Sequence, residues 1–288
     1  WMLDASFTRG WMNRLIGLAG ERQLPHYTKH RFDKWFARRA PAGQEPTRGR
    51  VILWDDSYAR YYDPHIAVAA VQVLESAGFE VTLLHGRKCC GRPAFSQGNL
   101  DEAKRLALHN VNLLSAQTEP MPVIFLEASC WSMFHEDYAE MSVPNAEAVA
   151  SRCFLFEQFM EELLQREPGA LTFDHRPGNV VIHAHCHAKS LTRTDYMKRL
   201  AERLPNRNVA MLDTGCCGMA GGFGMQESKY ELSMQVAQPL MELIKAQPFN
   251  TTVVASGTSC RHQIWHLANV KIRHMAELLS ESLALPPG

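Results

Sequence analysis

The chain has 288 residues, of which 46% are hydrophobic and 21% charged, so it can bury the core of one large or two ordinary globular domains. Thirty Lys and Arg residues balance thirty Asp and Glu residues, which excludes a global electrostatic basis for binding nucleic acid or an anionic membrane. No stretch approaches the roughly 20 consecutive apolar residues of a transmembrane helix.

Residues 1–20 carry Asp4, Arg9 and Arg14 and do not resemble a secretory signal peptide. We therefore expect a cytoplasmic protein, at most peripheral at the inner face of the membrane. The sequence opens on Trp1 without an obvious start, which is consistent with a piece of a longer polypeptide.

The N-terminal segment, residues 1–49, reads as helical, with helices expected over 7–18 and 30–40 and a loop over 41–46. From residue 50 onward, short apolar runs alternate with amphipathic helices, as is typical of a layered α/β fold. The first unit, residues 50–144, has expected strands at 51–54, 80–84 and 123–126. The second unit, residues 179–288, has expected strands at 180–182, 209–212 and 252–255. Between them, residues 145–178, we expect one long amphipathic helix over 145–166 and then a linker.

The two units repeat one pattern of strand, Cys-Cys-Gly, helix, strand and single Cys. The cysteine pairs begin at residues 89 and 216 and the single cysteines stand at 130 and 260, so both sets are separated by nearly the same number of residues. This indicates an internal duplication. Cys153 falls inside the expected long helix among phenylalanines, where buried apolar packing is the favoured interpretation.

The other cysteines favour a metal centre over a disulfide framework, because adjacent cysteines close strained rings and the chain has no export signal. Ligands gather beyond the carboxyl ends of parallel strands, and the second unit supplies four thiols there: Cys186, Cys216, Cys217 and Cys260. Four thiolates suit a [4Fe–4S] cluster. Zinc is the alternative metal, but no Cys-x-x-Cys knuckle is present.

The first unit supplies only Cys89, Cys90 and Cys130, because Ser57 aligns with Cys186. It therefore reads as a degenerate second set that faces the same crevice. Five further residues are candidates for tuning a cluster through hydrogen bonds or charge: His185, His187, Gly218, Arg261 and His262.

Two groups of residues resemble a known family. Cys89-Cys90-Gly91-Arg92-Pro93 is similar to the first half of the CCG, or cysteine-rich, domain of heterodisulfide reductase B subunits, glycolate oxidase iron–sulfur subunits and the anaerobic glycerol-3-phosphate dehydrogenase C subunit. Residues 185–187, 215–224 and 256–264 resemble the C-terminal iron–sulfur part of FAD-linked D-2-hydroxyglutarate or D-lactate dehydrogenase fusion proteins. The resemblance covers about residues 50–265.

The resemblance implies two pseudo-symmetric repeats with parallel-type strands and flanking helices. It also implies an oxidoreductase role: electrons pass from a D-2-hydroxy acid to FAD, then to the cluster, then to an acceptor such as a quinone. The chain shows no FAD-binding segment and no ferredoxin-type cysteine run, so FAD and a ferredoxin-like segment are expected in a partner domain or subunit. Two alternatives remain open: a zinc-stapled docking module without redox function, and thiol–disulfide chemistry like that of a heterodisulfide reductase.

Overall fold

Two four-stranded sheets, one in each repeat, form the framework of the computed structural model, which describes residues 15–40 and 46–284. The first sheet has the order β2-β1-β3-β4 and the second the order β6-β5-β7-β8, and every pairing between these strands is parallel. The strands are β1 Arg50–Trp54, β2 Glu80–Leu83, β3 Val123–Phe125, β4 Cys153–Leu155, β5 Gly178–Ile182, β6 Arg207–Met211, β7 Thr252–Val254 and β8 Ile272–Arg273. The identical strand order confirms the α/β duplication.

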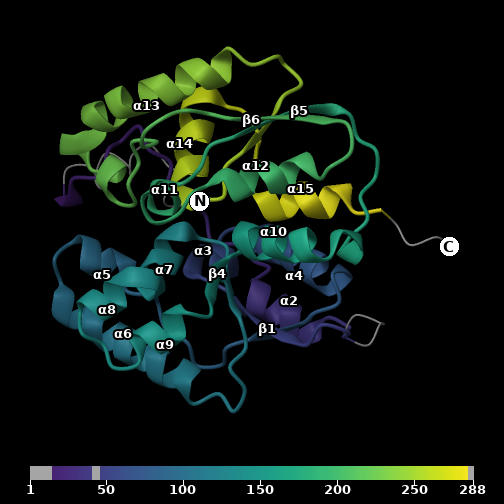
Figure 1. The fold of residues 1–288 in the computed structure, drawn as a ribbon. Helices are drawn as coiled ribbons and strands as arrows, with labels where there is room; N and C mark the ends of the chain where they lie inside the picture. Colours follow the sequence, from purple (N-terminus) through teal and green to yellow (C-terminus); the bar gives the residue numbers. More distant parts are fainter. Residues whose placement is uncertain (1–14, 41–45, 285–288) are drawn as a thin grey trace.

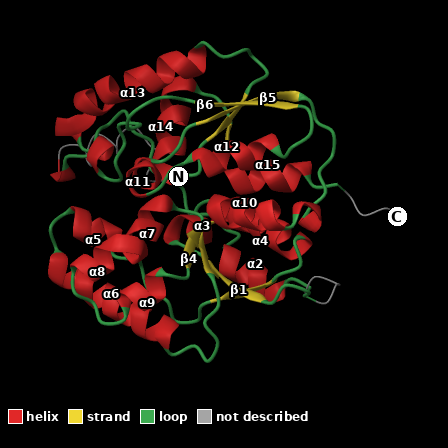
Figure 2. Cartoon of the chain, viewed as in Figure 1, coloured by secondary structure: helices red, strands yellow, loops and turns green. Residues whose placement is uncertain are grey.

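Helices cover the sheets (Figures 1 and 2). Those before and within the first repeat are α2 Phe32–Arg38, α3 Ser57–Tyr61, α4 Pro64–Ser76, α5 Arg92–Ser96, α6 Leu100–Ser115, α7 Ala128–Ser132, the π-helix η1 Met133–Asp137, α8 Tyr138–Glu140 and α9 Ala146–Ala150. The others are α10 Phe156–Arg166, η2 Pro168–Ala170, α11 Cys186–Leu191, α12 Asp195–Glu202, η3 Phe223–Met225, η4 Glu227–Lys229, α13 Tyr230–Lys245, α14 Thr258–Ala268 and α15 Met275–Ser282. Among the described residues, none of these helices combines the length and apolarity needed to cross a bilayer.

The expected helices of the repeats begin where the local chemistry predicts. Pro64 stands at the first turn of α4, where its missing N–H costs nothing. Asn99 caps α6 by accepting a hydrogen bond from the Glu102 N–H. Gly78 follows α4 with φ +84°, a left-handed conformation that ends the helix. The expected N-terminal helix over 30–40 is observed as α2, whereas that over 7–18 lies mostly outside the described residues.

The single long helix predicted over 145–166 is wrong. The chain forms α9, then β4, then α10, and Cys153 lies in β4, paired with Val123 of β3. Cys153 is nevertheless buried, as its packing interpretation requires. The helical pattern failed here because β4 has only three residues, too few for strand alternation to stand out from the flanking helices. The still shorter β8 was missed for the same reason.

The two repeats exchange their last helices. Helix α10 follows the last strand of the first sheet but packs on α12 of the second repeat, and α15 follows the last strand of the second sheet but packs on α4 of the first. Both helices lie in the middle of the molecule (Figure 1). One buried apolar cluster accordingly contains residues of both repeats, such as Leu74 from α4 and Leu279 from α15. The exchange holds the strand ends of the two sheets close together.

Candidate metal centre

Three neighbouring strands of the second sheet carry the four predicted ligands at their carboxyl ends. Cys186 begins α11 after β5, Cys216 and Cys217 follow β6, and Cys260 lies in the first turn of α14 after β7. The four thiols are neighbours in the order Cys186, Cys216, Cys217 and Cys260, and each perturbs the pKa of the next. The structure therefore brings the four predicted cysteines of this repeat together.

The four thiols differ in pKa: those of Cys186 and Cys217 are raised, and those of Cys216 and Cys260 are lowered. The hydrogen bond from Cys186 is the main reason that the pKa of Cys216 is lowered, to about 2. The hydrogen bond with Cys217 likewise lowers the pKa of Cys260, while the pKa values of Cys186 and Cys217 are raised by the same contacts. Since the thiolate is the form that binds metal, the group is partly prepared for ligation.

A tight turn after Cys217 brings the backbone against the thiols. The Gly218 N–H lies 3.3 Å from Cys216 Sγ, as expected for a turn that directs amides at sulfur. Gly218 has φ +85°, and a Cβ atom there would lie 2.2 Å from the Ser233 carbonyl oxygen. Gly91, the equivalent glycine of the first repeat, has φ +89°. Only glycine fits Gly218 without displacing α13.

The three cysteines of the first repeat also come together. Cys90 and Cys130 have their sulfur atoms 3.0 Å apart, and Cys89 hydrogen-bonds to Cys90. Ser57 begins α3 just as Cys186 begins α11, so it stands at the position of the missing fourth thiol. The neighbouring Asp56 uses its carboxylate to cap α3 by accepting from two backbone N–H groups.

The thiols of the first repeat are protonated. The Cys90–Cys130 hydrogen bond and burial raise the pKa of Cys90, and the contact with Cys90 raises that of Cys89. For Cys130 the hydrogen bond lowers the pKa, but burial and the carboxylates of Asp56 and Glu127 outweigh it and raise the pKa. The cysteines of the first repeat thus have carboxylates as their charged neighbours, whereas those of the second repeat have histidines.

The predicted tuning histidines lie between the two sets. His185 Nδ1 accepts the His187 N–H at 3.2 Å and lies 3.9 Å from Cys186 Sγ. His187 Nδ1 is 3.4 Å from the Ser132 hydroxyl of the first repeat, and burial lowers its pKa to about 4. Gly257 packs on His185 so closely that a Cβ atom would lie 2.1 Å from its ring. The two histidines are therefore held where the repeats meet.

His183 acts directly on the second cysteine set, through Cys260. Its Nδ1 is 3.0 Å from the Thr214 hydroxyl, and it helps to lower the pKa of Cys260. Its Nε2 is buried and has no hydrogen-bond partner of normal geometry within the described ranges. A buried unpaired nitrogen is costly in an apolar protein interior, and a neighbouring cluster sulfur would satisfy it.

Two polar residues that no cysteine pattern indicates support the site. Glu127, in the loop after β3, is 5% exposed and reaches across to the second repeat. Arg22, from the N-terminal segment, donates to Gly224 O, Gln263 Oε1 and Ser233 Oγ beneath the Gly218 turn. No feature of the isolated sequence could have identified either, because both act through long-range contacts.

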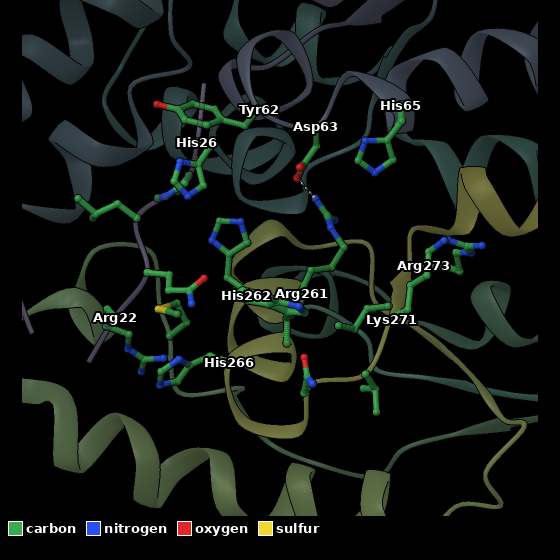
Figure 3. Close-up of a pocket in the computed structure, with 18 of the residues that line it drawn as sticks. Arg22, His26, Tyr62, Asp63, His65, Arg261, His262, His266, Lys271 and Arg273 are labelled. Atoms are coloured by element: carbon green, nitrogen blue, oxygen red, sulfur yellow. Dashed lines mark hydrogen bonds and ion pairs between the residues drawn. The ribbon is translucent and has the colours of Figure 1, made fainter. Parts of the chain in front are cut away.

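The two remaining predicted residues contact the first repeat and line a cavity. Arg261 donates to Ser256 O and lies 3.2 Å from Asp63 Oδ2 of the first repeat. His262 lies beside it on the wall of a cavity (Figure 3). Both follow Cys260 directly in the chain, so they connect this cavity to the thiol site.

The donors fit an iron–sulfur cluster in type and number. Four cysteines are the common ligand set, and an amide and an unpaired imidazole nitrogen lie beside them. The thiols contact one another, and in the described ranges no three or more Cys, His, Asp or Glu side chains are arranged to hold one metal ion. Binding therefore requires the thiols to move apart.

Comparison with known proteins supports the duplication. The family model described as the cysteine-rich domain, CCG, matches residues 57–135 and 180–265, together more than half of the chain. The C subunit of the anaerobic glycerol-3-phosphate dehydrogenase of Escherichia coli is 27% identical over 278 residues, covering 96% of this chain and 69% of its own length.

Two further relatives differ in how much of their length is shared. The lactate utilization protein A of Exiguobacterium is 26% identical over 234 residues, covering 76% of this chain and 92% of the relative. The D-2-hydroxyglutarate dehydrogenase of Pseudomonas putida is 26% identical over 235 residues, covering 80% of this chain and 22% of the relative. The same pair of repeats thus occurs in chains of very different length.

Proposed function

Because the chain belongs to the cysteine-rich CCG domain family, we propose that it is the iron–sulfur electron-transfer part of a dehydrogenase. The proposed ligands of a [4Fe–4S]-type cluster are Cys186, Cys216, Cys217 and Cys260. A bound cluster would supply one-electron transfer. The chain itself supplies the thiolates, the Gly218 amide and the buried histidines that surround them.

The observation that carries this proposal is the convergence of four thiols from three strand ends. Two of them have lowered pKa values without any metal. Zinc would use the same residues, but adjacent cysteines chelate one ion awkwardly and can instead reach two irons of a cluster. The docking module stapled by zinc is therefore the weaker alternative.

The finer proposal concerns the partner. The relatives are named as a subunit of a glycerol-3-phosphate dehydrogenase, a lactate utilization protein and a D-2-hydroxyglutarate dehydrogenase. We assign this chain to a FAD-dependent D-2-hydroxy-acid dehydrogenase, of D-2-hydroxyglutarate or D-lactate type. A partner domain or subunit would hold FAD and a ferredoxin-like segment, and the final acceptor would be a quinone or a similar carrier.

The test is iron, zinc and acid-labile sulfide analysis with an absorbance spectrum, on protein purified without oxygen. About four irons and four sulfides per chain are expected. Cys217→Ser should remove the visible absorbance and the iron, because it removes a thiolate from the middle of the group. Cys153→Ala is the matched control, since Cys153 is buried in β4 and donates to Val149 O at 3.2 Å, away from the site. About one zinc and no sulfide, or a Cys217→Ser variant that keeps its iron, would contradict the proposal.

The Cys90–Cys130 contact supports a second candidate function. Two thiols 3.0 Å apart can close a disulfide with loss of two protons and two electrons, which the flavin of a partner can accept. Their raised pKa values make them poor nucleophiles, so this is the weaker candidate. It predicts that alkylation of the first set abolishes reductase activity while iron and zinc contents stay unchanged.

A further inference from the structure

A cavity of about 710 Å³ opens beside the second cysteine set. Most of its wall comes from three parts of the chain, residues 22–26, residues 62–65 around the start of α4, and residues 261–273 of α14 and β8, and Met219 and Glu277 complete it. Figure 3 shows the side chains of all three parts directed towards one space. The volume lies within the range of pockets that hold small organic ligands.

Basic side chains dominate the charged part of this wall. Four cations, Arg22, Arg261, Lys271 and Arg273, face two carboxylates, Asp63 and Glu277. Asp63 pairs with Arg261 at 3.2 Å, and Glu277 with Arg273 at 3.8 Å. Within the described residues, no carboxylate lies within ion-pair distance of Arg22 or Lys271.

The two cations without a carboxylate differ in burial. Arg22 is only 3% exposed, and its hydrogen bonds to oxygen go to neutral groups, Gly224 O, Gln263 Oε1 and Ser233 Oγ. The guanidinium also lies over the Tyr230 ring, 5.0 Å from its centroid, and an anion in the cavity would add a favourable charge interaction with it. Lys271 is exposed and can reach an incoming ligand.

The remaining wall offers neutral donors and apolar surface. The His262 ring lines the wall, and burial lowers the pKa of His266, so the His266 ring is neutral at pH 7 and can donate one hydrogen bond. Trp265, 46% exposed, and Val270 and Ile272 line the same space. These residues would cover the organic part of a ligand whose charged group meets the cations.

We propose that this cavity binds a small organic oxyanion, a carboxylate or phosphate carried on an apolar or aromatic body. Arg261 and His262 follow Cys260 directly, and Met219, also on the wall, is separated from Cys217 only by Gly218. The ligand would therefore lie beside the thiols. If the proposed cluster is present, a bound anion would lower its reduction potential, and this consequence alone rests on the proposed function.

The test is calorimetric titration of the complete chain at low ionic strength with phenyl phosphate, benzoate, inorganic phosphate and neutral benzamide. Phenyl phosphate or benzoate should bind saturably at one site, and the tighter of the two identifies the charged group. Inorganic phosphate and benzamide should bind at least tenfold more weakly. Binding of benzamide or inorganic phosphate as tight as that of both organic anions, or no saturable binding, would overturn the proposal.

Lys271→Gln should weaken the binding of the organic anion by about five- to tenfold, as expected for loss of one solvent-accessible charge contact. Lys245→Gln is the matched control, because Lys245 is an exposed lysine at the end of α13, outside the cavity. Equal affinities in both variants would contradict the assignment. Iron measured on the same samples separates the two proposals. Anion binding without iron would contradict only the proposed cluster, and iron without anion binding would contradict only the proposed pocket.

Discussion

Glu127 Oε2 accepts a hydrogen bond from the backbone N–H of Thr258 at 2.7 Å, across the boundary between the two repeats. Thr258 begins α14, which carries Cys260, and Glu127 stands three residues before Cys130. Burial would raise the pKa of Glu127, but His185 and the Thr258 N–H outweigh it and hold the pKa at about 2. The carboxylate is therefore ionised and joins the two cysteine loops.

Glu127→Ala should lower the free energy of unfolding by about 2–3 kcal/mol, because it leaves the buried Thr258 N–H without an acceptor. Glu127→Gln keeps an acceptor oxygen and should cost less. Urea unfolding of both variants measures the difference. Glu147→Ala on the exposed surface of α9 is the control, with a change below about 0.5 kcal/mol. A Glu127→Ala variant as stable as this control would rule out the bridging role.

The turn after Cys217 can be tested with three glycines of one loop. Gly218→Ala combines a left-handed backbone with a Cβ atom 2.2 Å from Ser233 O. Gly221→Ala has only the backbone strain, since φ is +62° and nothing lies within 4 Å of its Cβ. Gly222→Ala has neither. We therefore expect Gly222→Ala to leave the free energy of unfolding almost unchanged and Gly221→Ala to lower it by about 1–2 kcal/mol. Gly218→Ala should lower it further.

Loss of bound iron should follow the same order if the turn shapes the cysteine site. Thermal unfolding and iron analysis on the three variants provide both measurements. Equal stability of Gly218→Ala and Gly221→Ala would show that the close contact with α13 does not constrain the turn.

The sequence predicted the elements whose patterns are local. Pro64, Asn99 and Gly78 are local signals that stand at helix boundaries, and the repeated Cys-Cys-Gly units indicated both sheets and the convergence of the thiols. The short strand β4 could not be predicted, because its three residues gain their conformation from pairing with β3. The exchange of α10 and α15 between the repeats could not be predicted either, because the hydrophobic face of a helix does not specify which other helix it will pack against.

The sequence indicated the cysteines of the site, the Gly218 turn and the histidines next to Cys186, but not the residues that reach the site from distant parts of the chain. Each cysteine of the two sets follows a strand, so topology alone places the thiols of a set at the carboxyl ends of its strands. Glu127 and Arg22 lie far in sequence from the groups they contact, and no spacing rule connects such pairs. The cavity likewise needs several distant segments, which only the folded chain brings together.

Arg22 ties the N-terminal segment to the second repeat, so changing it should affect a site some 200 residues away. Arg22→Met should lower the free energy of unfolding by about 2–4 kcal/mol, because Gln263 and Ser233 lose a buried donor. Arg22→Lys should recover only part of this, since an ammonium cannot reach all three acceptors. Arg105→Met is the control: its pair with Glu102 is exposed and should contribute less than about 1 kcal/mol. Guanidinium unfolding of the three variants makes the comparison, and an Arg22→Met change no larger than the control would contradict the assigned role.

His274 should make stability depend on pH. Its Nδ1 accepts from the Ala276 N–H, so Nε2 carries the proton and donates to Leu126 O of the first repeat at 3.0 Å. Burial, followed by Arg261, lowers the pKa of His274 from 6.5 to about 3. Between these two values the unfolded chain binds a proton that the folded chain does not. The contribution of neutral His274 to the free energy of unfolding is therefore fully present above pH 6.5 and is lost as the pH falls towards 3.

The measurement is urea unfolding from pH 7.5 down to pH 4.5 for the parent chain and for His274→Gln. The parent should lose up to about 1.4 kcal/mol per pH unit from this residue alone. His274→Gln removes that titration and should flatten the profile, although the lowered pKa of His187 leaves part of the slope. His30→Gln changes an exposed histidine and should leave the parent slope intact. Parallel profiles for the parent and His274→Gln would show that protonation of His274 does not open the contact between α15 and the first repeat.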